Sequence, residues 1–150
     1  MRRNNPWLIA GGVLSAAAAA LHLAVIAGGP DWYRFFGAGE EMARAAERGS
    51  LVPAAVTTGI AAVLAVWAAY AFAGAGAIGR LPLMRTALVA ISGVYLARGL
   101  LLVPALTVWP WDAFTVWSSA IVLVYGVVYA VGTWWAWREL SGRAPRSATR

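Results

Sequence analysis

The chain contains no cysteine, no lysine and only one histidine. Without cysteine it can hold no disulfide framework, thiol redox centre or cysteine-rich metal site. A single histidine, with no helical pairing of histidine and glutamate beside it, gives no basis for a zinc, di-iron or bis-histidine haem site within one chain. We therefore expect neither a metal nor a cofactor.

Charged residues are scarce as well, at 12% of 150 positions, while hydrophobic residues reach 61% and the mean hydropathy is +0.69. Soluble domains are about one quarter charged, so this composition is typical of a membrane protein. Each crossing of a bilayer needs about 20 apolar residues, which limits the chain to four or five spans.

Four stretches are long enough to cross a bilayer, and they predict an all-α, integral membrane four-helix bundle. Ser50 and Asp112 are expected to cap the second and fourth spans. Pro82 suits the start of the third span, and Pro104 is expected to kink or end it. The first stretch is longer than the apolar core of a signal peptide, so we interpret it as a span. We expect spans at 7–28, 51–74, 82–104 and 113–137, in a single domain over residues 1–140 with a flexible tail at 141–150.

Residues 31–48, between the first two spans, have a different composition. Aromatic residues come first, beginning at Trp32, and a charged stretch follows in which Glu40 and Arg44 stand four residues apart. Gly49 stands where a helix would end. We predict an aromatic interfacial turn followed by a short interfacial helix of about three turns.

The arginines predict the orientation of the bundle. Four crossings place both termini and the loop between the second and third spans on one side, and that side carries eight of the twelve arginines. The opposite loops carry three arginines against five acidic residues, so the positive-inside rule predicts cytoplasmic termini in a bacterial inner membrane. This topology accounts for the net charge of +6, and we expect no nucleic-acid binding. Tryptophans concentrate near both expected interfaces, as in an aromatic belt.

The helical rise of about 1.5 Å per residue predicts a polar layer in the outer half of the bundle. His22 of the first span and Arg98 of the third fall about 6 to 8 Å below the outer boundary of a hydrocarbon core about 30 Å thick. Hydroxyl groups of the two descending spans fall about 8 to 10 Å down. They belong to Thr57, Thr58, Ser118 and Ser119. If these faces converge, the bundle contains a polar pocket.

Arg98 is the strongest single feature, because an arginine at this depth is costly unless it is paired, hydrated or able to reach the headgroups. The spans contain no acidic residue, so the candidate counter-charges are Asp31, Glu40, Glu41 and Asp112 of the outer loops, and of these we favour Glu40 and Glu41. Ser92, Tyr95 and Arg98 recur every three residues, which would give the guanidinium polar neighbours on its own helix. Two interpretations stay open: the side chain binds a ligand, or it snorkels outward or forms a structural ion pair.

His22 shares a face with Ser15, so a hydrogen bond across the bundle is the simpler interpretation of the imidazole. The functional alternative is proton transfer together with Glu40 or Glu41, since imidazole titrates near neutral pH.

Small residues predict two ladders along which helices can approach closely. The ladders consist of Gly12, Ala16 and Ala20, and of Ala54, Thr58, Ala62, Ala65 and Ala69. These faces would serve packing within the chain or self-association.

The sequence identifies no family. Its tryptophan content is similar to that of the tryptophan-rich sensory proteins, which have five spans. Its length is similar to that of the small multidrug transporters, which carry a glutamate in the first span where this chain has His22. Neither resemblance is extended to the role of any residue.

Three functions fit this pattern. The first is binding or sensing of a small anionic or amphipathic molecule, and its expected ligand contacts are Arg98, His22, Tyr95, Ser92, Glu40, Glu41, Thr58 and Ser118. The second is an accessory or assembly subunit of a larger membrane complex, and the third is an oligomeric transporter or membrane-embedded enzyme. The sequence contains no catalytic triad, phosphate-binding loop or paired intramembrane carboxylate, so we assign no catalytic residue and favour a role without catalysis.

Overall fold

A computed structural model describes residues 5–107 and 113–141 of the chain. These residues form helices joined by turns, and four of the helices are long and apolar enough to cross a membrane. The predicted all-α fold with four spans is therefore confirmed. The helices are α1 (Pro6–Gly28), α2 (Pro30–Phe35), α3 (Glu40–Glu47), α4 (Val52–Ala75), α5 (Met84–Leu100), α6 (Leu102–Thr107) and α7 (Ala113–Ser141).

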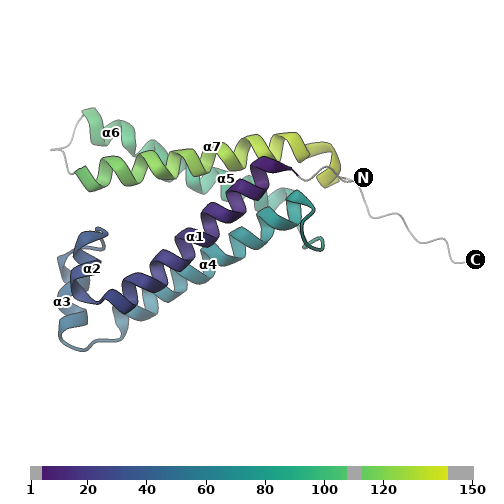
Figure 1. The fold of residues 1–150 in the computed structure, drawn as a ribbon. Coiled ribbons are helices and arrows are strands. Elements are labelled where there is room, and N and C mark those ends of the chain that lie inside the picture. The colour runs from purple at the N-terminus through teal and green to yellow at the C-terminus, as the bar shows by residue number, and fades with distance from the viewer. Residues whose placement is uncertain (1–4, 108–112, 142–150) are drawn as a thin grey trace, which may run out of the picture.

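The four long helices form two antiparallel hairpins, α1 with α4 and α5 with α7 (Figure 1). The hairpins cross and meet where α1 begins and α7 ends, which we call the proximal end. There Asn5 Nδ2 donates a hydrogen bond to the carbonyl of Gly132 at 2.7 Å. Leu8 is fully buried at the same end, between Gly74 and Gly132. The opposite end, which carries α2, α3 and α6, is the distal end, and there the hairpins lie apart.

Glycines hold α5 and α7 close together along their length. A Cβ atom at Gly99 would lie 2.6 Å from the Cα of Leu123, and one at Gly126 would lie 2.9 Å from the backbone nitrogen of Leu96. Contacts this short leave no room for a side chain, so backbone meets backbone on this seam. The two pairs also fix the antiparallel register of the hairpin.

The predicted small-residue ladders are only partly used for packing within the chain. Gly12 is buried, and a Cβ atom there would lie 2.8 Å from the ring of Phe72 on α4. The buried face of α4 instead runs through Thr57, Ala61 and Leu64, about one residue out of register with the predicted ladder. The remaining exposed positions do not pack within the described chain, so for them self-association stays a prediction; they are Ala16, Ala20, Thr58, Ala62 and Ala65.

The third span, Met84–Pro104, ends at the predicted proline, but its helix is interrupted before that residue. α5 stops at Leu100, four residues before Pro104. A proline ring clashes with the carbonyl group four residues earlier, so the break falls at Leu101 and not at the proline itself. Pro104 then lies in the first turn of α6, where a missing N–H group costs nothing.

Residues 31–48 form two short helices, so the predicted aromatic turn is corrected. Pro30 at the first position and Asp31 in the first turn favour a helix start, and they open α2. α3 has eight residues, about two turns instead of three. The link between them closes at Gly37, which has a φ of 69°. We call α2, α3 and this link the distal cap, and its small core consists of Val25, Tyr33 and Ala43.

The expected helix caps have different outcomes. The hydroxyl of Ser50 accepts a hydrogen bond from the N–H of Val52 at 3.3 Å, so it supports the start of α4, although the capping position itself is Leu51. Asp112 lies outside the described residues, as does the tail beyond Ser141.

Candidate functional site

The centre of the molecule contains three linked hydroxyl groups, which we call the hydroxyl cluster. Ser15 Oγ on α1 lies 2.9 Å from Tyr95 Oη on α5 and 2.8 Å from Tyr129 Oη on α7. Tyr129 also donates to the backbone carbonyl of Trp67 on α4, at 3.2 Å. All three side chains are buried, and the cluster joins the four long helices.

The hydrogen bonds of the hydroxyl cluster have one direction. The Trp67 carbonyl can only accept, so the single proton of Tyr129 is used there. Ser15 must then donate to Tyr129, and Tyr95 must donate to Ser15. Each of the three hydroxyl groups donates one hydrogen bond, and all three are neutral. The cluster therefore stabilises the packing of the four long helices against one another.

Aromatic rings fill the space around Tyr95. The rings of Trp67 and Tyr125 meet it nearly edge-on, with centroids 4.9 Å and 5.5 Å away. Tyr95, predicted as a ligand contact, is thus part of the core between the two hairpins.

Arg98 lies three residues beyond Tyr95, about 4.5 Å farther toward the distal end. Its Nη1 donates to Ser119 Oγ at 2.8 Å, and Nη2 lies 3.5 Å from Ser118 Oγ. The guanidinium is therefore turned toward the neighbouring helix α7. The expected polar neighbours on its own helix are not the groups that it binds, because Ser92 Oγ donates to the carbonyl of Leu88 at 2.7 Å.

The Arg98 side chain also reaches outward. Leu123 packs against Gly99, and Ser119 stands one turn earlier in α7, about 6 Å closer to the distal end. Arg98 is exposed although it continues the face on which Ile91 and Tyr95 are buried. The neighbouring hairpin therefore no longer covers α5 at this level.

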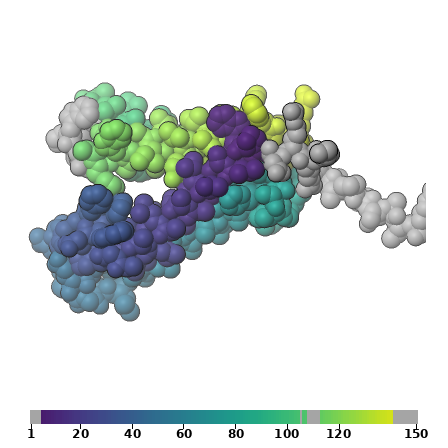
Figure 2. Space-filling view, viewed as in Figure 1, coloured from purple at the N-terminus to yellow at the C-terminus, as the bar shows by residue number. Residues whose placement is uncertain are grey.

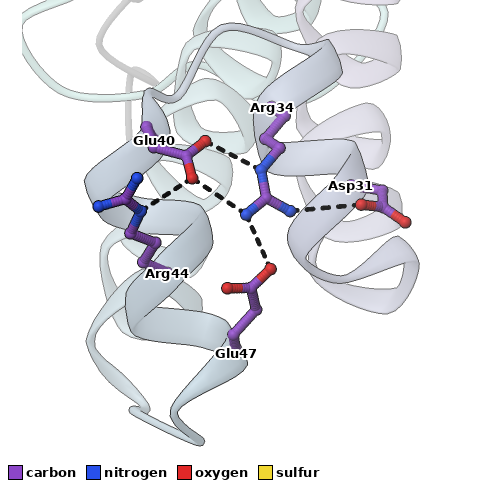
Figure 3. A network of polar contacts seen from close by, with 5 residues as sticks. All are labelled: Asp31, Arg34, Glu40, Arg44 and Glu47. Carbon is purple, nitrogen blue, oxygen red and sulfur yellow. Dashed lines mark hydrogen bonds and ion pairs between the residues drawn. The ribbon is translucent and has the colours of Figure 1, made fainter.

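The predicted ion pair between Arg98 and Glu40 is wrong, because Glu40 is bound to arginines of the distal cap (Figure 3). Arg34 Nε lies 2.9 Å from one carboxylate oxygen of Glu40, and Arg44 Nε lies 3.0 Å from the other. Arg34 also binds Glu47 at 2.7 Å and Asp31 at 3.3 Å. Two arginines of the cap thus pair with the carboxylate that we expected to serve Arg98.

These contacts shift the pKa values of two side chains in the cap, Glu40 and Arg34. The hydrogen bond from Arg34, and next the one from Arg44, lower the pKa of Glu40 to about 2. The same bonds to Glu40, and then Glu47, raise the pKa of Arg34. Glu41 is exposed and takes part in none of the four ion pairs found among the described residues.

His22 bonds within its own helix, so the expected bond across the bundle is corrected. Its Nδ1 lies 2.7 Å from the carbonyl of Ala18. A carbonyl only accepts, so Nδ1 carries the proton and Nε2 of the neutral ring is an acceptor. His22 stands seven residues, or about 10 Å, beyond Ser15 toward the distal end.

Thr58 is exposed, and the buried position on α4 belongs to Thr57. Consecutive residues of a helix point about 100° apart, so only one of the two threonines can face the core. Ser118, by contrast, is half-buried beside Arg98, and it donates its own proton to the carbonyl of Thr115 at 3.2 Å.

The space between the hairpins on the distal side of the hydroxyl cluster is open, and we call it the distal gap. Figure 2 shows a hollow between α1 and α7 that ends where the distal cap meets the start of α7. Gly37 forms that contact, since a Cβ atom there would overlap the ring of Phe114. The distal cap thus closes the outer end of the gap, and Arg98 stands on α5 about 4.5 Å beyond Tyr95 of the hydroxyl cluster in the direction of that cap.

Sequence reasoning missed Tyr129, which makes two hydrogen bonds in the core, and Arg34, which forms three of the four ion pairs of the cap. Tyr125 and Tyr129 stand four residues apart inside an uncharged span, and this pairing is a usable signal for a buried hydroxyl. Arg34 is followed by three glutamates interspersed with two arginines, and this pattern is a signal for a network of ion pairs. No group of three or more histidine, aspartate or glutamate residues that could hold a metal occurs in 5–107 or 113–141.

Comparisons with family models, with curated proteins and with solved structures found no match to this chain.

Proposed function

We propose that this multi-pass membrane protein binds a small anionic or amphipathic molecule in the distal gap. The observation that carries the proposal is the charge of Arg98. Its described partners, Ser118 and Ser119, are neutral hydroxyl groups. They do not balance the positive charge of the guanidinium, which lies in a membrane-spanning segment. An anion bound there would offset the cost of that charge.

The geometry suits an anionic oxygen group with an apolar body. A guanidinium has five N–H donors in a fixed fork, and the two hydroxyl groups use two of them. The others can bind a carboxylate, sulfonate or phosphate group. The apolar residues of the spans would cover the rest of the molecule. His22, on the opposite hairpin, offers Nε2 as an acceptor to any hydroxyl or acidic proton that the ligand carries.

The test compares dodecanoate with dodecanol, which share a chain and differ in charge. The purified full-length protein is kept in a neutral maltoside detergent, and its unfolding temperature is recorded against the concentration of each probe. Dodecanoate should raise the unfolding temperature more than dodecanol does. Arg98→Gln should abolish that difference, and Arg98→Lys should retain part of it because the charge is kept without the fork.

Arg48→Gln is the matched control, since it removes one exposed arginine from the distal cap. It should respond to dodecanoate as the unsubstituted protein does. Equal shifts from the two probes, or an undiminished response in Arg98→Gln, would refute the proposal. Circular dichroism of each variant checks that the helices are intact.

We further propose that the proximal end faces the cytoplasm of a bacterial inner membrane. The arginine distribution supports this orientation. The chain lacks cysteine, so single-cysteine variants report topology without background. In intact cells, a membrane-impermeant maleimide should label Ala38→Cys on the distal cap and should not label Ala77→Cys in the proximal loop. The reverse pattern would overturn the orientation.

A second candidate, an accessory or assembly subunit, is favoured by one observation. The small residues Ala62 and Ala65 face outward from α4 and are exposed. Small residues permit close contact with another membrane helix. Crosslinking of Ala62→Cys in native membranes tests this role. A specific product with a larger membrane protein, together with no response to dodecanoate, would favour the accessory role over ligand binding.

A further inference from the structure

One row of residues on α4 continues the contact between α4 and α5 toward the distal end. Trp67 begins the row, and the centroid of its ring lies 4.9 Å from that of Tyr95 on α5. Val63, Ile60 and Val56 stand four, seven and eleven residues before Trp67, so they share its face of the helix. They lie about 6, 10 and 16 Å farther toward the distal end. We call these three residues the α4 row.

The α4 row is exposed although it continues a face that touches the other hairpin. Val63 and Val56 are each 47% exposed and Ile60 is 44% exposed, whereas Trp67 is half-buried and Tyr95 is buried. The helix that covers this face at Trp67 therefore does not cover it at the α4 row. Since α4 and α5 belong to different hairpins, which lie apart at this end, the row faces the distal gap (Figure 1).

Arg98 stands level with the beginning of the α4 row. It lies about 4.5 Å beyond Tyr95 on α5, and the row begins about 6 Å beyond Trp67 on α4. On the proximal side of this level the space is filled, because the Tyr95 ring also packs against Tyr125, with centroids 5.5 Å apart. A molecule bound to Arg98 can thus extend toward the distal end, along the row, but not in the opposite direction.

We infer that the α4 row holds an aliphatic chain of the molecule that Arg98 binds, with the anionic group nearest the hydroxyl cluster and the chain directed toward the distal cap. The inference rests on the proposed function, and it names the class of ligand and its orientation. The ligand is an anionic amphiphile of the fatty-acid kind. Three apolar side chains spread over about 10 Å of helix offer contact to a chain and no hydrogen-bonding group, so they favour such a ligand over a small anion.

Photolabelling of the unsubstituted full-length protein tests the orientation. The probe is dodecanoate with a diazirine at the end of its chain, and the labelled residues are identified by mass spectrometry after irradiation in neutral detergent. The label should concentrate on residues 56–63 of α4, and excess dodecanoate should suppress it. Labelling concentrated around Trp67 and Tyr95, or spread evenly over the four spans, would overturn the inference.

Substitution of the row tests its contribution to affinity. Ile60→Trp should fill the distal gap beside Arg98 and weaken the binding of dodecanoate by about tenfold, the effect of excluding about two methylene groups from apolar surroundings. Val66→Trp is the matched control on the same helix. Val66 is 53% exposed and points about 120° away from Ile60, so its substitution should leave the binding of dodecanoate unchanged.

The failure of this inference can be told apart from the failure of the proposed function. Equal responses of the unsubstituted protein to dodecanoate and dodecanol would refute both. A response that depends on Arg98 but is undiminished in Ile60→Trp would leave anion binding intact and overturn the role of the α4 row. Equal losses in Ile60→Trp and Val66→Trp would overturn that role as well. If Ile60→Trp does not fold, as judged by circular dichroism, the photolabelling of the unsubstituted protein decides.

Discussion

Ser15 on α1 and Tyr129 on α7 share a buried hydrogen bond of 2.8 Å that joins the first membrane span to the last. Both hairpins therefore depend on one small hydroxyl group, which also accepts from Tyr95. This contact lies deep in the bundle, where no water can replace a lost partner.

Ser15→Ala should destabilise the protein by about 1 to 2 kcal/mol, because it leaves two tyrosine hydroxyl groups without their partner. Reversible unfolding in mixed detergent measures the effect. Tyr129→Phe removes the acceptor of the Ser15 proton and the donor to the Trp67 carbonyl, so it should cost a similar amount. The double variant should lose less stability than the sum of the losses in the two single variants, by about 0.6 kcal/mol or more. Strict additivity would show that the hydrogen bond is not formed.

Gly99→Ala should disrupt the α5–α7 hairpin, because its Cβ would lie 2.6 Å from the backbone of Leu123. Overpacking of this kind costs about 1 to 3 kcal/mol. Gly93→Ala is the control on the same helix, since a Cβ there meets nothing within 4 Å. It should be neutral or stabilising by up to about 1 kcal/mol, as expected for Gly to Ala within a helix. Thermal unfolding of both variants gives the comparison, and equal effects would contradict the close seam.

Gly37→Ala should loosen the distal cap for two reasons. The residue has a φ of 69°, which is strained for alanine, and the new methyl group would overlap the Phe114 ring. Gly39→Ala separates the two effects, because its φ is 96° but its Cβ would meet nothing within 4 Å. Hydrogen exchange of the cap amides should rise more in Gly37→Ala than in Gly39→Ala. A larger rise in Gly39→Ala would show that the Phe114 contact adds nothing.

Acid should open the distal cap. The pKa of Glu40 is lowered to about 2 from an ordinary value of 4.5, so its ion pairs contribute stability above pH 4.5 that is lost as the pH falls through about 2. Arg34, Arg44, Glu47 and Asp31 complete the group that this titration disturbs. Hydrogen exchange of α3 should increase over this range, after correction for the intrinsic rate.

Glu40→Gln should show the open behaviour already at neutral pH and little further change on acidification. Glu41→Gln, one residue away and outside the ion pairs, should behave as the unsubstituted protein does. A pH response that persists unchanged in Glu40→Gln would place the titrating group elsewhere.

Tyr33→Phe should be neutral or stabilising. The side chain is 2% exposed, and its hydroxyl has no hydrogen-bond partner among the described residues. Removing an unsatisfied buried hydroxyl relieves a desolvation penalty of about 1 kcal/mol or more. Thermal unfolding gives the answer. A loss comparable to that of Tyr129→Phe would indicate that the hydroxyl has a partner.

The spans could be predicted from the sequence because apolar length and helix signals depend on neighbouring residues. The break at Leu101 was within reach as well, since a proline acts four residues before its own position. The α2 part of the distal cap was predicted as a turn, because six residues with three aromatic side chains have no helical periodicity to detect. Pro30 and Asp31 were the usable signals for α2.

The candidate site was harder to predict, because depth along an axis does not determine which face of a helix turns inward. Thr57 and Thr58 have nearly the same depth, yet Thr57 is buried and Thr58 exposed. The partner of Glu40 could not be predicted either, because Arg34 lies close to Glu40 only when the chain turns tightly at Gly37. Rotation and turn geometry, both tertiary properties, decide these contacts.

The pairing of α1 with α4 and of α5 with α7 bears on how the chain assembles during synthesis. Each pair is contiguous in sequence apart from short connecting helices, so the first pair can insert and pack before the second leaves the ribosome. The bond from Asn5 to Gly132 and the bond from Ser15 to Tyr129 close only when α7 arrives. We therefore expect docking of two preformed halves to be the last step of folding.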